Sequence, residues 1–86
     1  MVYVIQAKYM GQYKIHLIFS DKKEGVVDLK DIITNDRRAI FQALKDVEQF
    51  KQFKVAMDTV VWSNGLDLSP EFLYQKLQSI ALSNKK

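Results

Sequence analysis

Side chains suited to catalysis or metal binding are few in this 86-residue chain, which has one histidine and no cysteine. A general base needs an orienting partner and a substrate group beside it, and a zinc site needs three or four converging ligands. His16 lies in an alternating segment, on the side opposite the apolar positions, which is typical of a surface histidine. We therefore predict a protein that is not an enzyme and has no catalytic residue, metal site or cofactor.

Three carboxylates near the last turn, those of Asp58, Asp67 and Glu71, are close enough in the chain to meet and bind a hard cation. The alternating acidic residues of a calcium-binding loop are missing, however. Turn formation and helix capping account for Asp67 and Glu71 more simply. The three glycines are isolated from one another, so the chain has no glycine-rich phosphate loop. We interpret these residues as structural.

The net charge of +3 and the pairing of aromatic with basic residues raise the question of nucleic-acid binding. Such pairs occur near Tyr9, near Tyr13 and in residues 50–54. Exposed aromatic side chains on a sheet can stack single-stranded bases. These aromatic residues share a strand face with other apolar residues, however, and acidic and basic residues are mixed along the chain. Core packing is the preferred interpretation, and contact with nucleic acid stays an alternative.

The elements that position these residues begin with three strands. Alternation of apolar and polar residues predicts them at residues 2–9, 13–19 and 26–29. The short glycine-containing loop between the first two favours a hairpin, and the three together favour a meander. Ile32 and Ile33 then break the period of two and indicate one short helical turn.

The middle of the chain has helical spacing followed by two more strands. A helix capped by Asp36 is predicted from three apolar residues on one face, Ile40, Phe41 and Leu44. Residues 47–50 either continue this helix or form a separate turn. Alternation returns at residues 53–57 and again at residues 60–62, which are the predicted fourth and fifth strands.

The last helix is the best-specified element. The turn-forming pair Asn64-Gly65 separates it from the fifth strand. Ser69 is a favoured N-cap, and Pro70 fits the first helical position. One apolar stripe follows, made of Leu73, Leu77, Ile80 and Ala81.

Together these elements give a β-β-β-α-β-β-α order. We predict an α+β domain with a mostly antiparallel sheet of about five strands and helices packed on one face. One domain covers residues 1–82, and a basic tail, residues 83–86, is expected to fray. Signal-peptide patterns and apolar runs long enough to span a membrane are missing from the sequence, so a cytoplasmic protein is expected.

One stretch of the sequence has a specific pattern. It reads Trp62-x-Asn64-Gly65-x-Asp67-Leu68-Ser69-Pro70-Glu71-x-Leu73-Tyr74. Upstream residues agree with it: Tyr13-x-Ile15-x-Leu17-x-Phe19-x-Asp21, Val27-Asp28-Leu29, Phe41-x-x-Leu44 and Phe50. In these motifs the chain resembles a small bacterial family, the domain of unknown function 2442.

The resemblance implies a short cytoplasmic prokaryotic protein with an α+β fold. Some members of the family have an additional helix-turn-helix domain, which this sequence lacks. Others are encoded beside a second small protein, an arrangement similar to a toxin–antitoxin pair. The family has no assigned catalytic residues, so the resemblance transfers none.

Our leading hypothesis is a non-enzymatic interaction module that binds a protein partner, as the antitoxin-like half of a two-gene bacterial unit. The candidate contact residues are Trp62, Asn64, Asp67 and Tyr74. A regulator that contacts nucleic acid, directly or through a partner, is the alternative. A small-molecule-binding domain is a further alternative, and a homodimer is compatible with all three because a small β-rich domain has edges that can pair.

Overall fold

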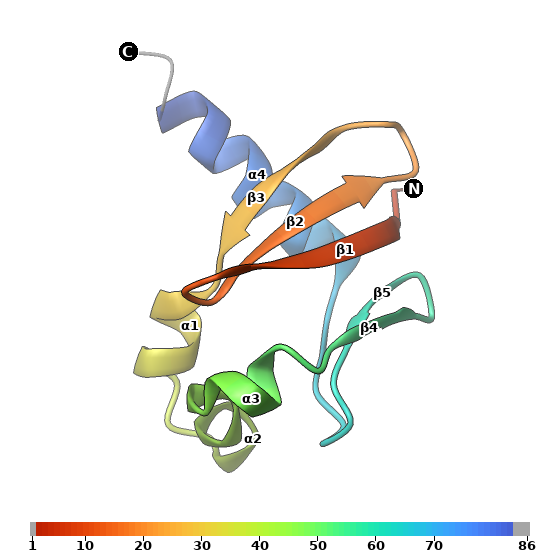
Figure 1. The fold of residues 1–86 in the computed structure, drawn as a ribbon. Coiled ribbons are helices and arrows are strands. Elements are labelled where there is room, and N and C mark those ends of the chain that lie inside the picture. Colours follow the sequence, from red (N-terminus) through yellow and green to blue (C-terminus); the bar gives the residue numbers. More distant parts are fainter. Residues whose placement is uncertain (1, 84–86) are drawn as a thin grey trace.

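The structure is a computed structural model in which residues 2–83 are described (Figure 1). Three strands, a run of short helical segments, three more strands and a last helix follow one another along the chain, and the domain is α+β as predicted. The strands are β1 (Val4–Gly11), β2 (Lys14–Phe19), β3 (Glu24–Asp28), β4 (Lys54–Ala56), β5 (Thr59–Val61) and β6 (Asp67–Leu68). The helices are α1 (Lys30–Asn35), α2 (Ala39–Gln42), the 3-10 turn η1 (Ala43–Lys45), α3 (Val47–Phe50) and α4 (Pro70–Ser83).

The first sheet has the order β1-β2-β3, with antiparallel pairs throughout, and it confirms the predicted meander. Its inner face comes from the alternation seen in the sequence, because Ile15, Leu17 and Phe19 of β2 are fully buried. Between β1 and β2 the chain turns through Gln12 and Tyr13, which both have positive φ angles of 54° and 63°. A two-residue turn of this kind matches the right-handed twist of the paired strands.

The second sheet has the order β4-β5-β6 and is separate from the first. The prediction of one sheet of about five strands is therefore wrong, since the structure has two antiparallel sheets of three strands each. The two sheets meet where β1 begins, and one backbone hydrogen bond joins them there, from Val4 N to Asp58 O at 2.9 Å. Figure 1 shows the tip of the β4–β5 hairpin beside the start of β1.

Strand β6 exists because a tight turn folds the chain back along β5. The N–H of Gly65 bonds to the carbonyl of Trp62 at 3.1 Å, and the N–H of Trp62 bonds to the carbonyl of Leu66 at 2.9 Å. Gly65 has a φ of 95°, which other residues rarely adopt. The turn predicted at Asn64-Gly65 thus begins a third hairpin, and the sequence analysis missed its short second strand.

Five aromatic side chains fill the space between the two sheets, and we call them the aromatic junction. Phe50, at the end of α3, is fully buried at its centre. Its ring centroid lies within 5.2 to 6.3 Å of the other four, which are Tyr9 and Tyr13 of the first hairpin and Phe53 and Trp62 beside the second sheet. Strands β1 and β4 contact one another here without forming a continuous ladder.

The helical middle of the chain is broken into short pieces. The helical turn predicted around Ile32 and Ile33 is α1. The helix predicted to start at Asp36 starts later, with Arg38 at its N-cap position, while Asp36 ends α1. Residues 47–50 form a separate turn, α3, whose first free N–H groups are capped by the Asp46 side chain.

Helix α4 starts as predicted. Ser69 Oγ accepts a hydrogen bond from the N–H of Phe72 at 3.1 Å, which confirms the N-cap. The helix packs on β3 at Gly25, where an added Cβ would lie 2.3 Å from a methyl carbon of Leu77. Gly25 therefore gives the helix the close approach that buries Leu73. The side chains of Ile80 and Ala81, and the predicted tail beyond Ser83, lie outside the described residues.

Candidate functional site

Trp62, the first of the predicted contact residues, belongs to the core. Only 5% of it is exposed, and its ring packs against Phe50 and Phe53. Its Nε1 donates a hydrogen bond of 2.7 Å to the backbone carbonyl of Phe50. The polar atom of the indole is thus satisfied inside one copy of the chain, and the residue connects β5 to the end of α3.

Asn64 and Asp67 lie at the surface of the same hairpin. Asn64 is exposed in the turn, and its Oδ1 accepts a hydrogen bond from the N–H of Leu66 at 3.1 Å. Asp67 is exposed on β6 opposite Val61. The first of these residues stabilises the turn that brings β6 back to β5.

Tyr74 connects α4 to the first sheet. Its hydroxyl donates a hydrogen bond of 2.7 Å to Oδ2 of Asp21 in the β2–β3 loop. Its ring also packs edge-on against Phe19, with the centroids 5.1 Å apart. The Tyr74 hydroxyl and the backbone N–H of Lys23 hold the pKa of the Asp21 carboxyl below its usual value. The contacts of Tyr74 therefore lie in the β2–β3 region, whereas Trp62, Asn64 and Asp67 belong to the β5–β6 hairpin.

His16 forms a polar contact with Glu24. Its Nε2 lies 3.0 Å from Oε1 of Glu24 across the outer face of the first sheet. Both side chains are partly exposed. The pair joins β2 to β3, and within the described residues no hydroxyl nucleophile hydrogen-bonds to the imidazole.

The carboxylates do not assemble into a metal site. Within residues 2–83, no group of three or more His, Asp or Glu side chains is arranged to hold an ion. Asp58 occupies the tip of the β4–β5 hairpin with a φ of 67°, and its backbone carbonyl joins the sheets. Glu71 lies in the first turn of α4. Asp67, for which the sequence analysis preferred a turn or capping role, lies on β6 instead.

The hollows on the described surface include one beside α1 and one at the β1–β2 turn. The hollow beside α1 has a volume of about 410 Å³ and is wide open to solvent. The hollow at the β1–β2 turn has a volume of about 300 Å³. The first is lined by Asp31, Ile32, Asn35 and Asp36, and the second by Gln12, Tyr13, Lys14, Asp28 and Lys30.

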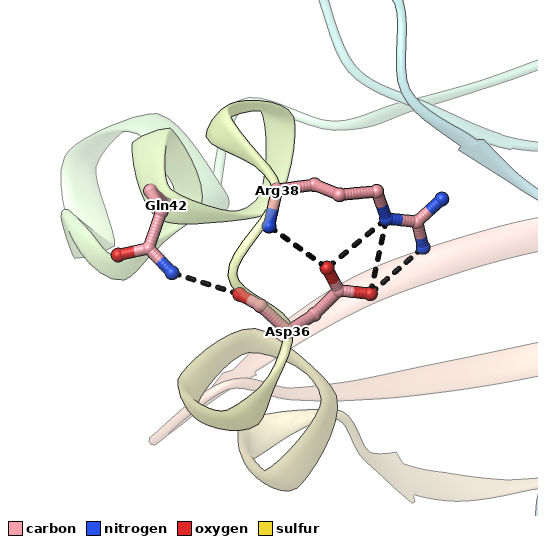
Figure 2. A network of polar contacts seen from close by, with 3 residues as sticks. All are labelled: Asp36, Arg38 and Gln42. Carbon is pink, nitrogen blue, oxygen red and sulfur yellow. Dashed lines mark hydrogen bonds and ion pairs between the residues drawn. The ribbon is translucent and has the colours of Figure 1, made fainter.

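A polar network holds the connection between α1 and α2 (Figure 2). Asp36 Oδ2 accepts a bond of 2.7 Å from the Arg38 guanidinium, and Asp36 Oδ1 accepts one of 3.0 Å from the Arg38 backbone N–H. The side chain of Gln42 donates to the carbonyl of Asp36 at 2.8 Å. The bonds from Arg38 keep the pKa of the Asp36 carboxyl below its usual value, and the carboxylate raises the pKa of Arg38. The guanidinium also lies 4.9 Å from the centre of the Phe41 ring.

Exposed apolar side chains occur where the two sheets meet at the start of β1, and we call this region the open end. Tyr3 and Ile5 flank Val4, whose N–H bonds to Asp58, and they are 41% and 54% exposed. Met57, next to Asp58 at the hairpin tip, is 86% exposed. Val55 of β4 is also exposed, and β4 contacts β1. Strand alternation placed these residues in strands but gave no sign that two sheets would meet here.

The signature from Trp62 to Tyr74 now has a structural account, since it forms the β5–β6 turn and the cap of α4. A family model described as protein of unknown function (DUF2442) matches residues 4–79. The chain belongs to the DUF2442 family. The matched region includes both sheets and most of α4. No curated protein and no solved structure matches the chain.

None of the helices within residues 2–83 is long and apolar enough to cross a bilayer.

Proposed function

We propose that this protein is a non-enzymatic interaction module that binds a protein partner, as the antitoxin-like half of a two-gene bacterial unit. The observation that supports the proposal is the open end. Tyr3, Ile5, Val55 and Met57 expose apolar surface around a contact that has one backbone hydrogen bond. Exposed apolar side chains that come together in this way are typical of protein interaction sites.

The open end replaces the earlier candidate surface in part. Trp62 and Tyr74 use their polar atoms in contacts within the chain, with Phe50 and Asp21. A partner that covers the open end contacts β1 and the β4–β5 hairpin instead. The exposed Asn64 and Asp67 remain candidates for the edge of such an interface.

Co-expression with the product of the adjacent gene tests the proposal. We expect the two proteins to co-purify and to elute together in size-exclusion chromatography, with a mass that corresponds to a stoichiometric complex. The double variant Ile5→Ser with Met57→Ser should weaken the complex, because it removes exposed apolar surface at the open end.

The matched control is Phe72→Ser, which changes an exposed apolar residue of α4. A complex that Phe72→Ser weakens as much as the double variant does would show that the open end is not the contact. Separate elution of the two wild-type proteins would count against the pairing itself.

A further inference from the structure

The outer edge of β1, which we call its free edge, has no ladder partner among residues 2–83, although β4 and β5 contact the strand. Strand β1 is the longest described strand, with eight residues, and it lies on the outside of the first sheet. The backbone hydrogen bond from Val4 to Asp58 is the one bond that links β1 to the second sheet among residues 2–83. A long edge strand is a template on which a further strand can pair.

The hydrogen bonds of β2 show which backbone groups face that edge. Successive residues of an antiparallel strand direct their N–H and C=O groups to alternate sides. Phe19 N–H bonds to the carbonyl of Lys23, and the carbonyl of Tyr13 accepts from the N–H of Leu29. The odd-numbered residues of β2 therefore face β3, and the even-numbered ones face β1.

The even-numbered residues of β2 pair with Gln6 and Lys8 of β1. Because Gln6 and Lys8 direct their backbone groups to β2, Ala7 and Tyr9 direct theirs to the free edge. No described segment outside the sheet donates to or accepts from these groups. The pairing is irregular between Val4 and Gln6 and again after Tyr9, so about four residues of regular strand can accept a partner.

The side chains along this edge are apolar, basic or, at Gln6, polar and uncharged. On its outer side β1 exposes Lys8 and Met10, and β4, which contacts β1, exposes Lys54. Neither strand contains an acidic residue. No described ion pair involves Lys8 or Lys54. A carboxylate on an added strand opposite Lys8 would gain a cross-strand pair.

A second copy of this chain fits the edge less well than an acidic strand does. Symmetric pairing through Ala7 and Tyr9 places Lys8 opposite Gln6, Lys8 or Met10 of the other copy. In each register the two Lys8 side chains are opposite one another or one diagonal step apart, where like charges repel. Charge complementarity therefore favours an acidic segment as the added strand, rather than β1 of a second copy of the chain.

We propose that the free edge of β1 binds an extended segment of the partner protein in which acidic and apolar side chains alternate. The added strand would bond to the N–H and C=O groups of Ala7 and Tyr9, with a carboxylate beside Lys8 and an apolar side chain toward Ile5 of the open end. This inference rests on the proposed function and specifies where and what the module binds.

Two synthetic peptides test the inference directly. One is a nine-residue peptide that alternates Glu and Val, and the other has Lys at every Glu position. We expect the acidic peptide to bind the ¹⁵N-labelled protein at least about tenfold more tightly than the basic one, as measured by fluorescence anisotropy. In NMR spectra of the ¹⁵N-labelled protein titrated with the acidic peptide, the amide signals of Ala7 and Tyr9 should shift. Hydrogen exchange at these two amides should also slow, because the peptide occupies the donors.

Two variants distinguish the contribution of backbone pairing to peptide binding from the contribution of charge. Lys8→Glu should reverse the preference between the peptides, whereas the control Lys30→Glu, at the exposed start of α1, should leave it unchanged. Ala7→Pro removes one edge N–H without removing a bond to β2, so it should abolish binding of the acidic peptide. If Ala7→Pro lowers the melting temperature strongly, the Lys8→Glu reversal decides alone.

Several results would overturn the inference. They are equal binding of the two peptides, no binding of the acidic peptide at about 1 mM, or amide shifts that avoid Ala7 and Tyr9. A dimer in sedimentation with both amides protected would identify the occupant as a second copy. If a co-expressed partner still forms a complex but leaves these amides unprotected, the proposed function survives and the β1 site does not.

Discussion

The two ends of the contact between the sheets are built in opposite ways. At one end, the aromatic junction buries Phe50 among four other rings, and Trp62 adds a buried hydrogen bond to it. At the open end, one backbone hydrogen bond joins Val4 to Asp58 beneath exposed apolar side chains. The comparison indicates that stability is concentrated at the aromatic junction, which leaves the open end available for binding.

The typical free energies of these interactions support the view that the aromatic junction is the more stable end. Burying one large apolar side chain contributes about 1.5–3 kcal/mol. A net intramolecular hydrogen bond contributes about 0.5–1.5 kcal/mol. Several rings and a buried bond at one end therefore outweigh a single bond at the other, and substitutions at the two ends should differ in both size and sign.

The largest effect should come from Phe50→Ala. It removes the central ring of the aromatic junction, so we expect a loss of about 3–5 kcal/mol in the free energy of unfolding, enough to unfold much of the protein. Urea denaturation followed by circular dichroism measures the change. Phe72→Ala is the control, since Phe72 is partly exposed on α4. Equal losses for the two variants would remove the distinction between the aromatic junction and the surface.

Trp62→Phe should have the next largest effect. Phenylalanine keeps a ring but lacks Nε1, which leaves the carbonyl of Phe50 without its donor. A buried unsatisfied group costs about 1–3 kcal/mol, and the midpoint of urea denaturation should fall accordingly. A midpoint equal to that of the wild type would mean that solvent reaches this carbonyl and that the hydrogen bond adds nothing to the junction.

Sequence reasoning succeeded where local signals are strong. The alternation in β2, the N-cap at Ser69 and the turn at Asn64-Gly65 are properties of neighbouring residues, and all three are confirmed. The α+β class followed from the order of these elements. The family signature from Trp62 to Tyr74 consists largely of turn and cap residues, which explains why it was recognisable without a function.

Sequence reasoning failed where distant segments meet. The number of sheets depends on whether β1 pairs with β4, and no ladder forms between them. Periodicity within each segment predicts a strand but does not determine which distant strand it pairs with. Trp62 was proposed as a contact residue, and its burial depends on packing against Phe50 and Phe53.

At the open end, Met57→Asn should stabilise the protein. Met57 and Asp58 form the β4–β5 turn with positive φ angles of 52° and 67°, a conformation that asparagine adopts more readily than methionine. Met57 is 86% exposed, so little packing is lost. We expect a gain of about 0.4–1 kcal/mol in the free energy of unfolding, read from the midpoint of urea denaturation. A loss of stability would mean that the Met57 side chain supports the open end.

The smallest effect on stability is expected in acid unfolding. Acid acts on the polar connection between α1 and α2 and on neither end of the contact between the sheets. Hydrogen bonds from Arg38 lower the folded-state pKa of Asp36 below its ordinary value of 3.8. The stability that the ionised carboxylate adds is therefore complete above about pH 5 and is lost as the pH falls through the lower, folded-state pKa. Asp36→Asn lacks this contribution at every pH.

The difference in unfolding free energy between wild type and Asp36→Asn should thus be constant near neutral pH and shrink below about pH 4. Asp31→Asn, an exposed carboxylate of α1, is the matched control. The cost of Phe50→Ala should persist at low pH, since ring packing carries no charge. If that cost disappears together with the Asp36 contribution, the aromatic junction depends on the α1–α2 connection, and the stable end of the contact includes this polar network as well as the rings.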